Sequence, residues 1–358
     1  MAWAELEYTR QEINGAGALF RPSAYVSEDT VRAINIIDNF RVAHAYPLNT
    51  LQTNLRARVR PIKGNIIAQR LKRMPSILAK LYRFPTMQLW DMQDIGGCRA
   101  IVPDLNDVQQ LVNTYKSSKS RMRRKLAGEK NYIQNPRDSG YRGRHLIYRY
   151  ISDSNEIYNG LKIEIQLRTN LQHAWATAVE TVDAFTQQAL KSSKGKPDWE
   201  RFFQLMGTEM AFREGTPPVQ NTPANREELR SELRQCANEL QVEKNFEAFT
   251  AAIGRTRRPS IKASDYILLS LDANKKRLNV DVYPRKYLSQ AVIEYSKKEQ
   301  KILDNKEGNA VLVSVDSFNH LKRAYPNYFA DTRLFIKILK DSIKKRGRFW
   351  IFQWIKLA

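Results

Sequence analysis

Two carboxylates lie beside short apolar runs of this chain, in positions from which they can take part in phosphoryl chemistry. The first, Glu164, lies in 161–168, where apolar and polar residues alternate strictly, as they do on the two faces of a β-strand. On the polar face, Glu164 can bind a divalent cation or accept a proton, and Lys162 and Arg168 can hold phosphates. A strand with one face in water has the same pattern, so both interpretations stay open at this point.

The second carboxylate, Asp94, stands just before another strand-like run, 97–102, which Pro103 ends. A side chain at the edge of one strand can reach the face of a neighbouring strand. Mg²⁺ commonly takes one or two carboxylates plus substrate phosphates, so Asp94 and Glu164 together predict a magnesium site. Taken alone, Asp94 also fits an ordinary loop cap.

A helix with one basic face is predicted upstream of Asp94. Pro75 suits the first position of a helix, and hydroxyl and basic side chains then recur at spacings of four and three residues, on one side. The face either lies in water or forms a clamp for a triphosphate, to which the positive end of the helix would add. The candidate phosphate-binding residues, including two that precede the helix, are Arg70, Lys72, Ser76, Lys80 and Arg83.

A turn rich in arginine follows at residues 135–145. Proline, aspartate, serine and glycine mark the turn, and the segment adds three arginines, a tyrosine and a histidine. Tyrosine stacks on bases and arginine pairs with phosphates, so the loop suits a nucleotide, although a basic turn alone does not identify a ligand. Its candidate binding residues are Arg137, Tyr141, Arg144 and His145.

The charge of the chain is consistent with such ligands. It carries 59 lysines and arginines against 37 aspartates and glutamates in 358 residues, a formal net charge of +22, and its pI is about 9.9. Such an excess predicts a polyanionic partner, which can be a nucleic acid, a nucleotide polyphosphate or an anionic membrane surface. Hydrophobic residues make up 42% of the chain, which excludes a mostly disordered basic tail.

Composition also bears on compartment and metals. The chain has two cysteines, Cys98 and Cys236, too few for a disulfide framework or a cysteine-based zinc site. No apolar run reaches the roughly 18 residues of a transmembrane helix, and the N-terminus has no signal-peptide pattern. These features predict a soluble, cytoplasmic protein without stable membrane insertion.

The elements that must position these residues form two predicted units and a connector. The expected divisions are 1–215, then a linker and helical connector at 216–262, then a small α+β unit at 263–358. In the first unit we expect helices over most of 1–60, from 75, at 105–115 and at 171–185, strands at 97–102, 146–151 and 161–168, and a basic loop or frayed helix at 116–130. We expect a helix at 226–253, then strands at 266–271, 278–283 and 310–315, and helices at 287–303, 317–323 and 332–344.

The four candidate segments, taken in order, resemble the RelA/SpoT synthetase domain of the alarmone synthetases. The motifs run from Arg70 to Arg83, from Asp94 to Arg99, from Ser139 to His145 and from Glu164 to Thr169, and the resemblance covers about residues 55–185. It implies an α+β fold with a nucleotidyltransferase-like mixed sheet flanked by helices. It also implies transfer of the β,γ-pyrophosphate of ATP to a ribose 3′-hydroxyl, with Mg²⁺ as the cofactor and AMP as the leaving group.

The resemblance assigns a role to each candidate residue. Asp94 and Glu164 would be the catalytic metal-binding carboxylates, with Glu164 also a candidate base for the attacking hydroxyl, which agrees with phosphoryl chemistry being mostly positioning and charge neutralisation. The ATP site would comprise Arg70, Lys72, Ser76, Lys80, Arg83 and Arg99. The acceptor site would comprise Arg137, Tyr141, Arg144, His145, Gln166 and Arg168, with Tyr141 stacking on the acceptor base.

Departures from the usual pattern point to one branch of the family. Ser139 stands where asparagine is common, and Gly143 and Arg144 replace the usual serine and leucine before the histidine. Because the chain has only four histidines, we expect no histidine–aspartate hydrolase domain before the match. The chain therefore looks more like the toxic small synthetases, which pyrophosphorylate the 3′-CCA end of tRNA and stop translation. A small alarmone synthetase making (p)ppGpp or (pp)pApp, and an inactive nucleotide- or RNA-binding module, are the alternatives.

The C-terminal unit contains a YxxY motif, Tyr325 and Tyr328. It resembles the toxic synthetases fused to their own antitoxin, the CapRel type, in which a pseudo-zinc-finger blocks the ATP site through such a motif and a phage capsid protein releases the block in anti-phage defence. Residues 265–358 hold no cysteine and one histidine, His320, so we expect no zinc. Ordinary packing of the tyrosines is the alternative. The aromatic segment 348–355 is predicted to bind a trigger or a membrane surface, or to pack on this unit.

Overall fold

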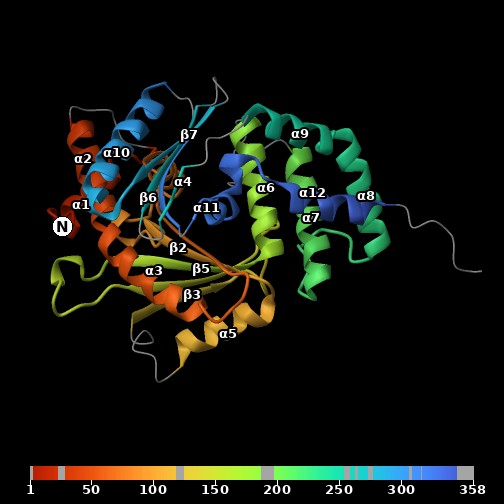
Figure 1. Ribbon diagram of the computed structural model, residues 1–358, viewed down its shortest axis with the longest axis horizontal. Helices are drawn as coiled ribbons and strands as arrows, with labels where there is room; N and C mark the ends of the chain where they lie inside the picture. The colour runs from red at the N-terminus through yellow and green to blue at the C-terminus, as the bar shows by residue number, and fades with distance from the viewer. Residues whose placement is uncertain are drawn as a thin grey trace, which may run out of the picture.

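The computed structural model describes residues 3–22, 29–117, 125–186, 197–253, 259–262, 265–272, 277–305, 309–315 and 317–344. Its centre is an eight-stranded sheet in the order β3-β4-β5-β2-β1-β8-β6-β7 (Figure 1). The β2–β5 pair is parallel and the other neighbouring pairs are antiparallel, which confirms the expected mixed sheet in an α+β fold. The strands are β1 (Ile66–Leu71), β2 (Gly96–Val102), β3 (Leu126–Asn131), β4 (Arg144–Arg149), β5 (Lys162–Thr169), β6 (Tyr266–Asp272), β7 (Arg277–Tyr283) and β8 (Asn309–Ser314).

Helices flank this sheet and form a bundle at one end of it (Figure 1). Within the described ranges they are α1 (Arg10–Ala18), α2 (Asp29–Ala43), α3 (Ala45–Val59), α4 (Met74–Arg83), α5 (Leu105–Lys116), α6 (Asn170–Thr186), α7 (Pro197–Glu214), α8 (Arg226–Glu239), α9 (Val242–Ile253), α10 (Leu288–Asn305), α11 (Phe318–Ala324) and α12 (Arg333–Ile343). In this part of the chain no helix combines the length and apolar character that a membrane span needs.

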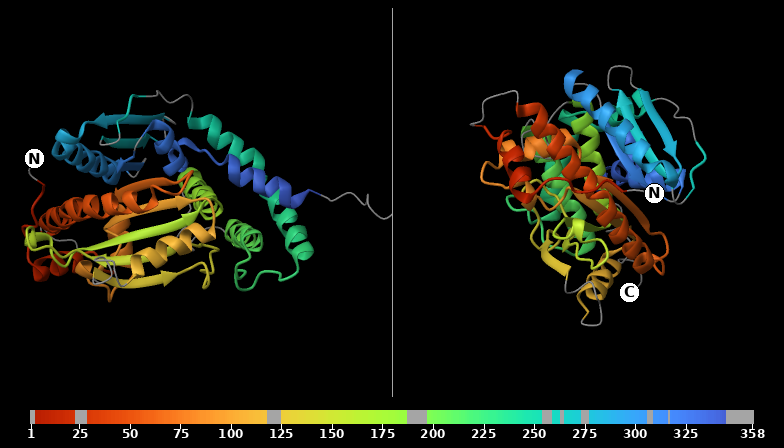
Figure 2. Two further views of the ribbon diagram at one scale, coloured as in Figure 1. Left: turned by 60° about the horizontal axis from the view of Figure 1, so that its bottom comes forward. Right: turned by 90° about the vertical axis from the view of Figure 1, so that its left-hand side faces the viewer.

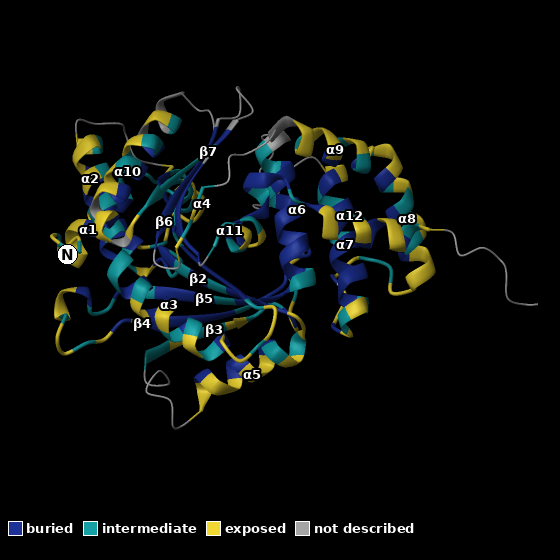
Figure 3. Cartoon of the chain, viewed as in Figure 1, coloured by how far each residue is buried: buried dark blue, intermediate teal, exposed yellow. Residues whose placement is uncertain are grey.

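The alternation in β5 divides its side chains as predicted. Ile163, Ile165 and Leu167 are buried against α3 and α5. The polar side chains face the other way, yet Glu164 and Arg168 are only 6% and 4% exposed. The polar face of β5 is therefore covered rather than solvated. Part of this cover is α6, which is buried along most of its length between the sheet and the helical bundle (Figure 3).

The C-terminal strands continue the sheet of the upstream strands. Strand β8 joins β1 through the pairs Gln69–Ser314 and Arg70–Val313. Helix α12, which follows these strands in the chain, lies beside α6 and α8 of the helical bundle (Figure 2). Its Phe335 is buried in the core of the bundle. The expected divisions at 215 and 262, and the pseudo-zinc-finger character of the last unit, stay predictions.

Several local predictions need correction. The segment 226–253 is two helices, α8 and α9, because Gln241 between them has a positive φ of 45°. Residues 126–131, expected in a basic loop or helix, form β3. Strand β1 and helix α7 were not predicted. Two further expectations lie outside the described residues: most of the basic segment 116–130, namely 118–124, and the aromatic segment 348–355.

A buried ion pair ties the C-terminal unit to the helices at the start of the chain. Glu299 of α10 accepts a hydrogen bond from Arg41 Nη1 of α2 at 2.5 Å, and both side chains are buried. The other Glu299 oxygen accepts from the backbone N–H of Met74 (3.2 Å), at the start of α4, and from the hydroxyl of Tyr295 (2.9 Å). Arg41 also donates to Asp38. One carboxylate from α10 thus holds α2 and α4 together.

Removing this carboxylate is expected to be costly. Glu299→Ala leaves the buried Arg41 guanidinium facing a single carboxylate, so we expect the free energy of unfolding in urea to fall by about 3–5 kcal/mol. The control is Glu294→Ala on the same helix, which removes an exposed pair with Lys297 and is expected to cost less than about 1 kcal/mol. Equal changes in the two variants would show that the buried pair does not tie the units together.

Candidate active site

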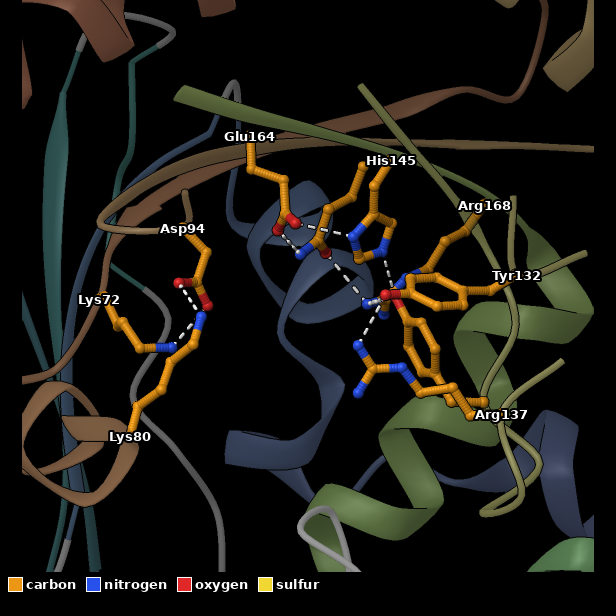
Figure 4. A network of polar contacts seen from close by, with 10 residues as sticks. Lys72, Lys80, Asp94, Tyr132, Arg137, His145, Glu164 and Arg168 are labelled. Carbon is orange, nitrogen blue, oxygen red and sulfur yellow. Dashed lines mark hydrogen bonds and ion pairs between the residues drawn. The ribbon is translucent and has the colours of Figure 1, made fainter. Parts of the chain in front are cut away.

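Asp94 and Glu164 line one pocket on the covered face of the sheet, together with Arg70, Arg99 and Arg168. The parallel register of β2 and β5 places Gly97 opposite Glu164, so the loop before β2 brings Asp94 toward the same region (Figure 4). The sequence-based expectation that carboxylates of neighbouring strands meet therefore has a structural basis. Their roles as a metal site and base stay proposals.

The carboxylate of Asp94 is held by two ammonium groups. Lys72 Nζ donates to one oxygen at 2.6 Å and Lys80 Nζ to the other at 2.8 Å (Figure 4). Burial alone would raise the pKa of Asp94, but the two lysines outweigh it and hold that pKa well below its usual range. Asp94 is therefore ionised at neutral pH. It lies just before β2, whereas Lys72 directly follows β1 and Lys80 lies in α4.

The carboxylate of Glu164 lies in a chain of side-chain hydrogen bonds on the other side of the pocket (Figure 4). One oxygen is 2.7 Å from His145 Nδ1, and the other accepts from Gln166 Nε2 at 2.6 Å. Burial opposes ionisation, yet the contact with His145 outweighs it and lowers the pKa of Glu164. The carboxylate therefore keeps the unprotonated form that a proton acceptor requires.

These hydrogen bonds continue to the arginine-rich turn at residues 135–145, here called the acceptor loop after the role predicted for it. The hydroxyl of Tyr141 is 2.6 Å from His145 Nε2 and accepts a hydrogen bond from Arg168 Nη2 at 2.7 Å. The same Arg168 atom donates to Gln166 Oε1 at 3.0 Å. Because an ionised carboxylate can only accept, His145 Nδ1 donates to Glu164. The five side chains of this network are thereby fixed with respect to one another.

Buried arginine donors without a hydrogen-bond partner face this pocket. In the described part of the chain, Nε of Arg99 and both Nε and Nη1 of Arg168 are buried and unpaired. Burial, with the charge of Arg168 adding to it, lowers the pKa of Arg99 to about 10. Buried cations and unpaired donors are costly unless an anion satisfies them. The pocket is therefore suited to a ligand with several anionic oxygens, such as a chain of phosphates.

The donor set also fits a magnesium ion. Within the described residues there is no group of three or more histidine, cysteine, aspartate or glutamate side chains able to enclose a metal. Two carboxylates facing a phosphate-binding pocket are the usual protein contribution to bound Mg²⁺, which otherwise keeps waters and substrate oxygens. Asp94 and Glu164 would supply those two carboxylates, with the metal taking the place of one of the lysine contacts that hold Asp94.

Not every predicted residue reaches the pocket. Arg144 neighbours His145 on β4 and points to the opposite face, where it pairs with Glu129, which also pairs with Lys116 of α5. Arg83 is exposed at the end of α4, with its guanidinium 5.4 Å from the Phe84 ring centre. Ser76 is half-buried in the first turn of α4 and is not among the side chains that line the pocket.

Two residues near the pocket were not among the candidates. Glu180 of α6 lines the pocket and its charge acts on both Arg70 and Arg99; the helical pattern predicted α6 but not which polar side chain faces inward. Tyr132 directly follows β3 and its hydroxyl accepts from Arg137 Nη2 at 2.8 Å (Figure 4). The arginine also lies over the Tyr132 ring, 4.5 Å from its centre. Tyr132 lacked a signal because β3 was not predicted.

The YxxY motif of the C-terminal unit lies against the same pocket. The buried hydroxyl of Tyr325 donates to the Gln69 carbonyl of β1 at 2.8 Å, and Tyr325 lines the pocket. Arg99 donates to the carbonyl of Ala324 at 3.1 Å, and its guanidinium carbon is 5.4 Å from the Tyr325 ring centre. Tyr328 is also buried, and burial raises the pKa of both tyrosines despite nearby arginines. An arginine of the predicted ATP site is thus occupied by the C-terminal unit.

Comparison with known proteins gives a match over the same motifs. Residues 69–185 match the family described as "Region found in RelA / SpoT proteins". Two curated relatives are the GTP pyrophosphokinases YwaC and YjbM of Bacillus subtilis (strain 168), 32% and 30% identical over 113 residues. These matches cover 30% and 31% of this chain and 52% of each relative. The chain thus spans about half the length of the curated relatives it matches.

Solved structures give a weaker similarity. Small alarmone synthetase 1 from Bacillus subtilis, bound to its product pppGpp, is 24% identical, with a TM-score of 0.40 over 49% of this chain and 91% of that one. A GTP pyrophosphokinase family protein from Streptococcus pneumoniae is 20% identical, with a TM-score of 0.39 over 61% of this chain and 98% of that one. The family match and the curated relatives, rather than these structures, show that residues 69–185 are similar to the region found in RelA/SpoT proteins.

Proposed function

We propose that this protein is an ATP-dependent pyrophosphokinase that transfers the β,γ-diphosphate of ATP to a ribose 3′-hydroxyl. The observation that carries the proposal is that one pocket holds both the ionised, buried Glu164 and the buried donors of Arg99 and Arg168 that have no hydrogen-bond partner. Such a pocket provides a proton acceptor beside a place for phosphates. The names of the matched relatives, both GTP pyrophosphokinases, agree with this chemistry.

The proposed reaction needs positioning and charge neutralisation more than covalent chemistry by the protein. The ribose 3′-oxygen attacks the β-phosphorus of ATP, its proton passes to Glu164, and the bond to the bridging oxygen on the α-phosphate breaks, so AMP leaves. Arg99 and Arg168 would bind phosphate oxygens, and His145 keeps Glu164 oriented. Mg²⁺, held by Asp94 and Glu164 when bound, would neutralise charge on the phosphates. Arg70 would add positive charge at the ATP end of the pocket.

For the acceptor we propose the 3′-CCA end of tRNA, whose modification would block translation. The support is the net charge of +22, which exceeds what one nucleotide needs, and the unusual Ser139 and Gly143 of the acceptor loop. Arg144 does not contribute, since it faces α5. The second candidate is a small alarmone synthetase making (p)ppGpp or (pp)pApp; the names of the relatives, GTP pyrophosphokinases, favour the guanosine product.

We further propose that the C-terminal unit is an antitoxin that keeps the enzyme inactive. Tyr325 and Ala324 engage the pocket through Gln69 and Arg99, so ATP would compete with this contact. A tethered inhibitor acts at an effective concentration in the millimolar range. A trigger that binds the open state alone would shift the population toward activity. A phage capsid protein is the proposed trigger, and anti-phage defence in the cytoplasm the proposed setting.

One assay separates the candidate functions. Full-length protein and its Tyr325→Ala variant are incubated with ATP labelled at the γ-phosphate, Mg²⁺, deacylated tRNA and GDP, with and without a phage capsid protein. Label on tRNA supports the main proposal, and label on GDP refutes it in favour of an alarmone synthetase. Label on an adenosine nucleotide would likewise indicate an alarmone synthetase, and no label on tRNA, GDP or an adenosine nucleotide, even in the Tyr325→Ala variant, would indicate an inactive nucleotide- or RNA-binding module.

A further inference from the structure

A contact between two glycines joins α7 to the loop that carries Tyr141. A Cβ atom on Gly207 of α7 would lie 2.9 Å from Gly140 Cα and 3.0 Å from Gly140 O, and a Cβ atom on Gly140 would lie 2.8 Å from the Phe203 carbonyl oxygen. Gly140 also has a φ of +94°, a region that other residues rarely adopt. The backbones of helix and loop are therefore in direct contact, with no room for a side chain between them.

Two hydrogen bonds fix the same contact on either side. Trp175 Nε1 of α6 donates to the Phe203 carbonyl at 2.9 Å, and Arg142 Nε donates to the Gly207 carbonyl at 3.3 Å. Arg142 is 2% exposed, so its guanidinium is committed to this position. Carbonyls one turn apart on α7 thus accept from Trp175 of α6 and from Arg142, two residues after Gly140.

Tyr141 lies between Gly140 and Arg142, the two loop residues that contact α7. Its hydroxyl contacts His145 Nε2 at 2.6 Å, and His145 Nδ1 contacts Glu164 at 2.7 Å. A backbone shift at Gly140 would move Tyr141 and disturb the hydrogen bond that orients His145 toward Glu164. Packed interiors transmit such a shift because they contain little free space.

We propose that Gly207 is a positioning residue for the acceptor half of the active site. Because Gly207 has no side chain, the loop backbone can lie directly on α7, and this contact fixes the positions of Tyr141 and His145. The inference rests on the proposed pyrophosphokinase function. It concerns the acceptor more than ATP: Lys72, Lys80 and Asp94 lie on other elements, and Arg168 is the proposed phosphate ligand that contacts Tyr141.

Gly207→Ala tests this in the full-length chain. The added methyl group meets backbone atoms, which must move by a few tenths of an ångström. Amide hydrogen exchange over 135–145 is expected to accelerate about tenfold, because the loop bond from the Gly140 N–H to the Arg137 carbonyl (2.8 Å) loosens. The matched control is Gly15→Ala, a helix glycine in α1 whose added Cβ would meet no atom within 4 Å. It is expected to leave exchange over 135–145 unchanged.

The kinetic arm uses the Tyr325→Ala background, with and without Gly207→Ala. The KM for the labelled acceptor is expected to rise about tenfold or more, while the KM for ATP changes less than about twofold, because a small misplacement acts on the group that it displaces. Trp175→Phe, which removes the hydrogen bond to Phe203 but keeps a ring, should give a smaller shift in the same direction if Gly207→Ala does not fold. Unchanged exchange in an active chain, or equal rises in both KM values, would overturn the inference alone. If exchange in the Gly207→Ala chain accelerates as expected, but neither this chain nor its Tyr325→Ala parent transfers label to any acceptor, the proposed function is overturned instead.

Discussion

Replacement of Glu164 by glutamine is expected to reduce diphosphate transfer by a factor of about 10²–10⁴, the range typical for loss of a general base. The amide oxygen can still accept the hydrogen bond from His145, which keeps the side chain near its place even though the amide NH2 loses the bond from Gln166 Nε2; the amide cannot take the proton of the attacking hydroxyl. The rate is measured with γ-labelled ATP in the Tyr325→Ala background, in which the proposed block is absent.

The control for Glu164→Gln lies on the opposite face of the same sheet. Glu129 of β3 pairs with Arg144 and Lys116, away from the pocket, so Glu129→Gln is expected to keep the transfer rate within about threefold, as for a surface charge change. If Glu164→Gln retains more than about a tenth of the rate, in contrast to the losses expected for a base, Glu164 is not the proton acceptor.

The second large effect is expected from Tyr325→Ala. The side chain is 3% exposed and bonded to Gln69 of β1, and removing a buried aromatic side chain typically costs about 3–5 kcal/mol. If that cost falls on the closed state alone, the open population rises by a factor of about 10² or more, since 1.4 kcal/mol corresponds to tenfold. The transfer rate without a trigger should rise accordingly, and induced expression should arrest growth.

Two further variants make this prediction specific. Adding Glu164→Ala to Tyr325→Ala is expected to restore growth, because toxicity would then require transfer. Tyr287→Ala removes an exposed tyrosine of the same C-terminal unit and is expected to behave as the wild type. Harmless Tyr325→Ala and Tyr328→Ala variants, with transfer rates equal to that of the wild type, would argue against an intramolecular block.

The parts of the site that sequence could predict are those with a clean periodicity or a fixed spacing. Alternation in β5 separated the buried Ile163 and Ile165 from Glu164, and Pro75 marked the beginning of α4, where it occupies a first-turn position. The alternation did not reveal that the polar face is covered, because the pattern of one strand carries no information about what packs over it: α6, which follows β5 directly, and Tyr325 of the C-terminal unit both border the pocket there. Arg144 was grouped with His145 by motif, although neighbours on a strand face opposite ways.

The elements that were missed have physical reasons. Strand β1 is buried on both faces, so its residues do not alternate between apolar and polar. Helix α7 is enclosed by α6, α8 and α12, with Phe202, Phe203 and Met206 all buried, and such a helix has no distinct polar side. The contact of Gly207 with Gly140 depends on this unpredicted helix, and a single glycine in a sequence does not reveal what it touches.

The pairing of β8 with β1 has a consequence for the lifetime of an activated molecule. While the C-terminal unit is docked, β8 satisfies the backbone of β1 at Gln69 and Arg70. If the unit moves away, β1 becomes the edge of the remaining sheet, and an edge strand with apolar side chains such as Ile66 and Ile67 is a template for pairing with another chain. An activated molecule would then lose activity by self-association through this edge. A trigger that covers the edge would prevent this loss. The amount of free trigger would therefore set how long each molecule stays active.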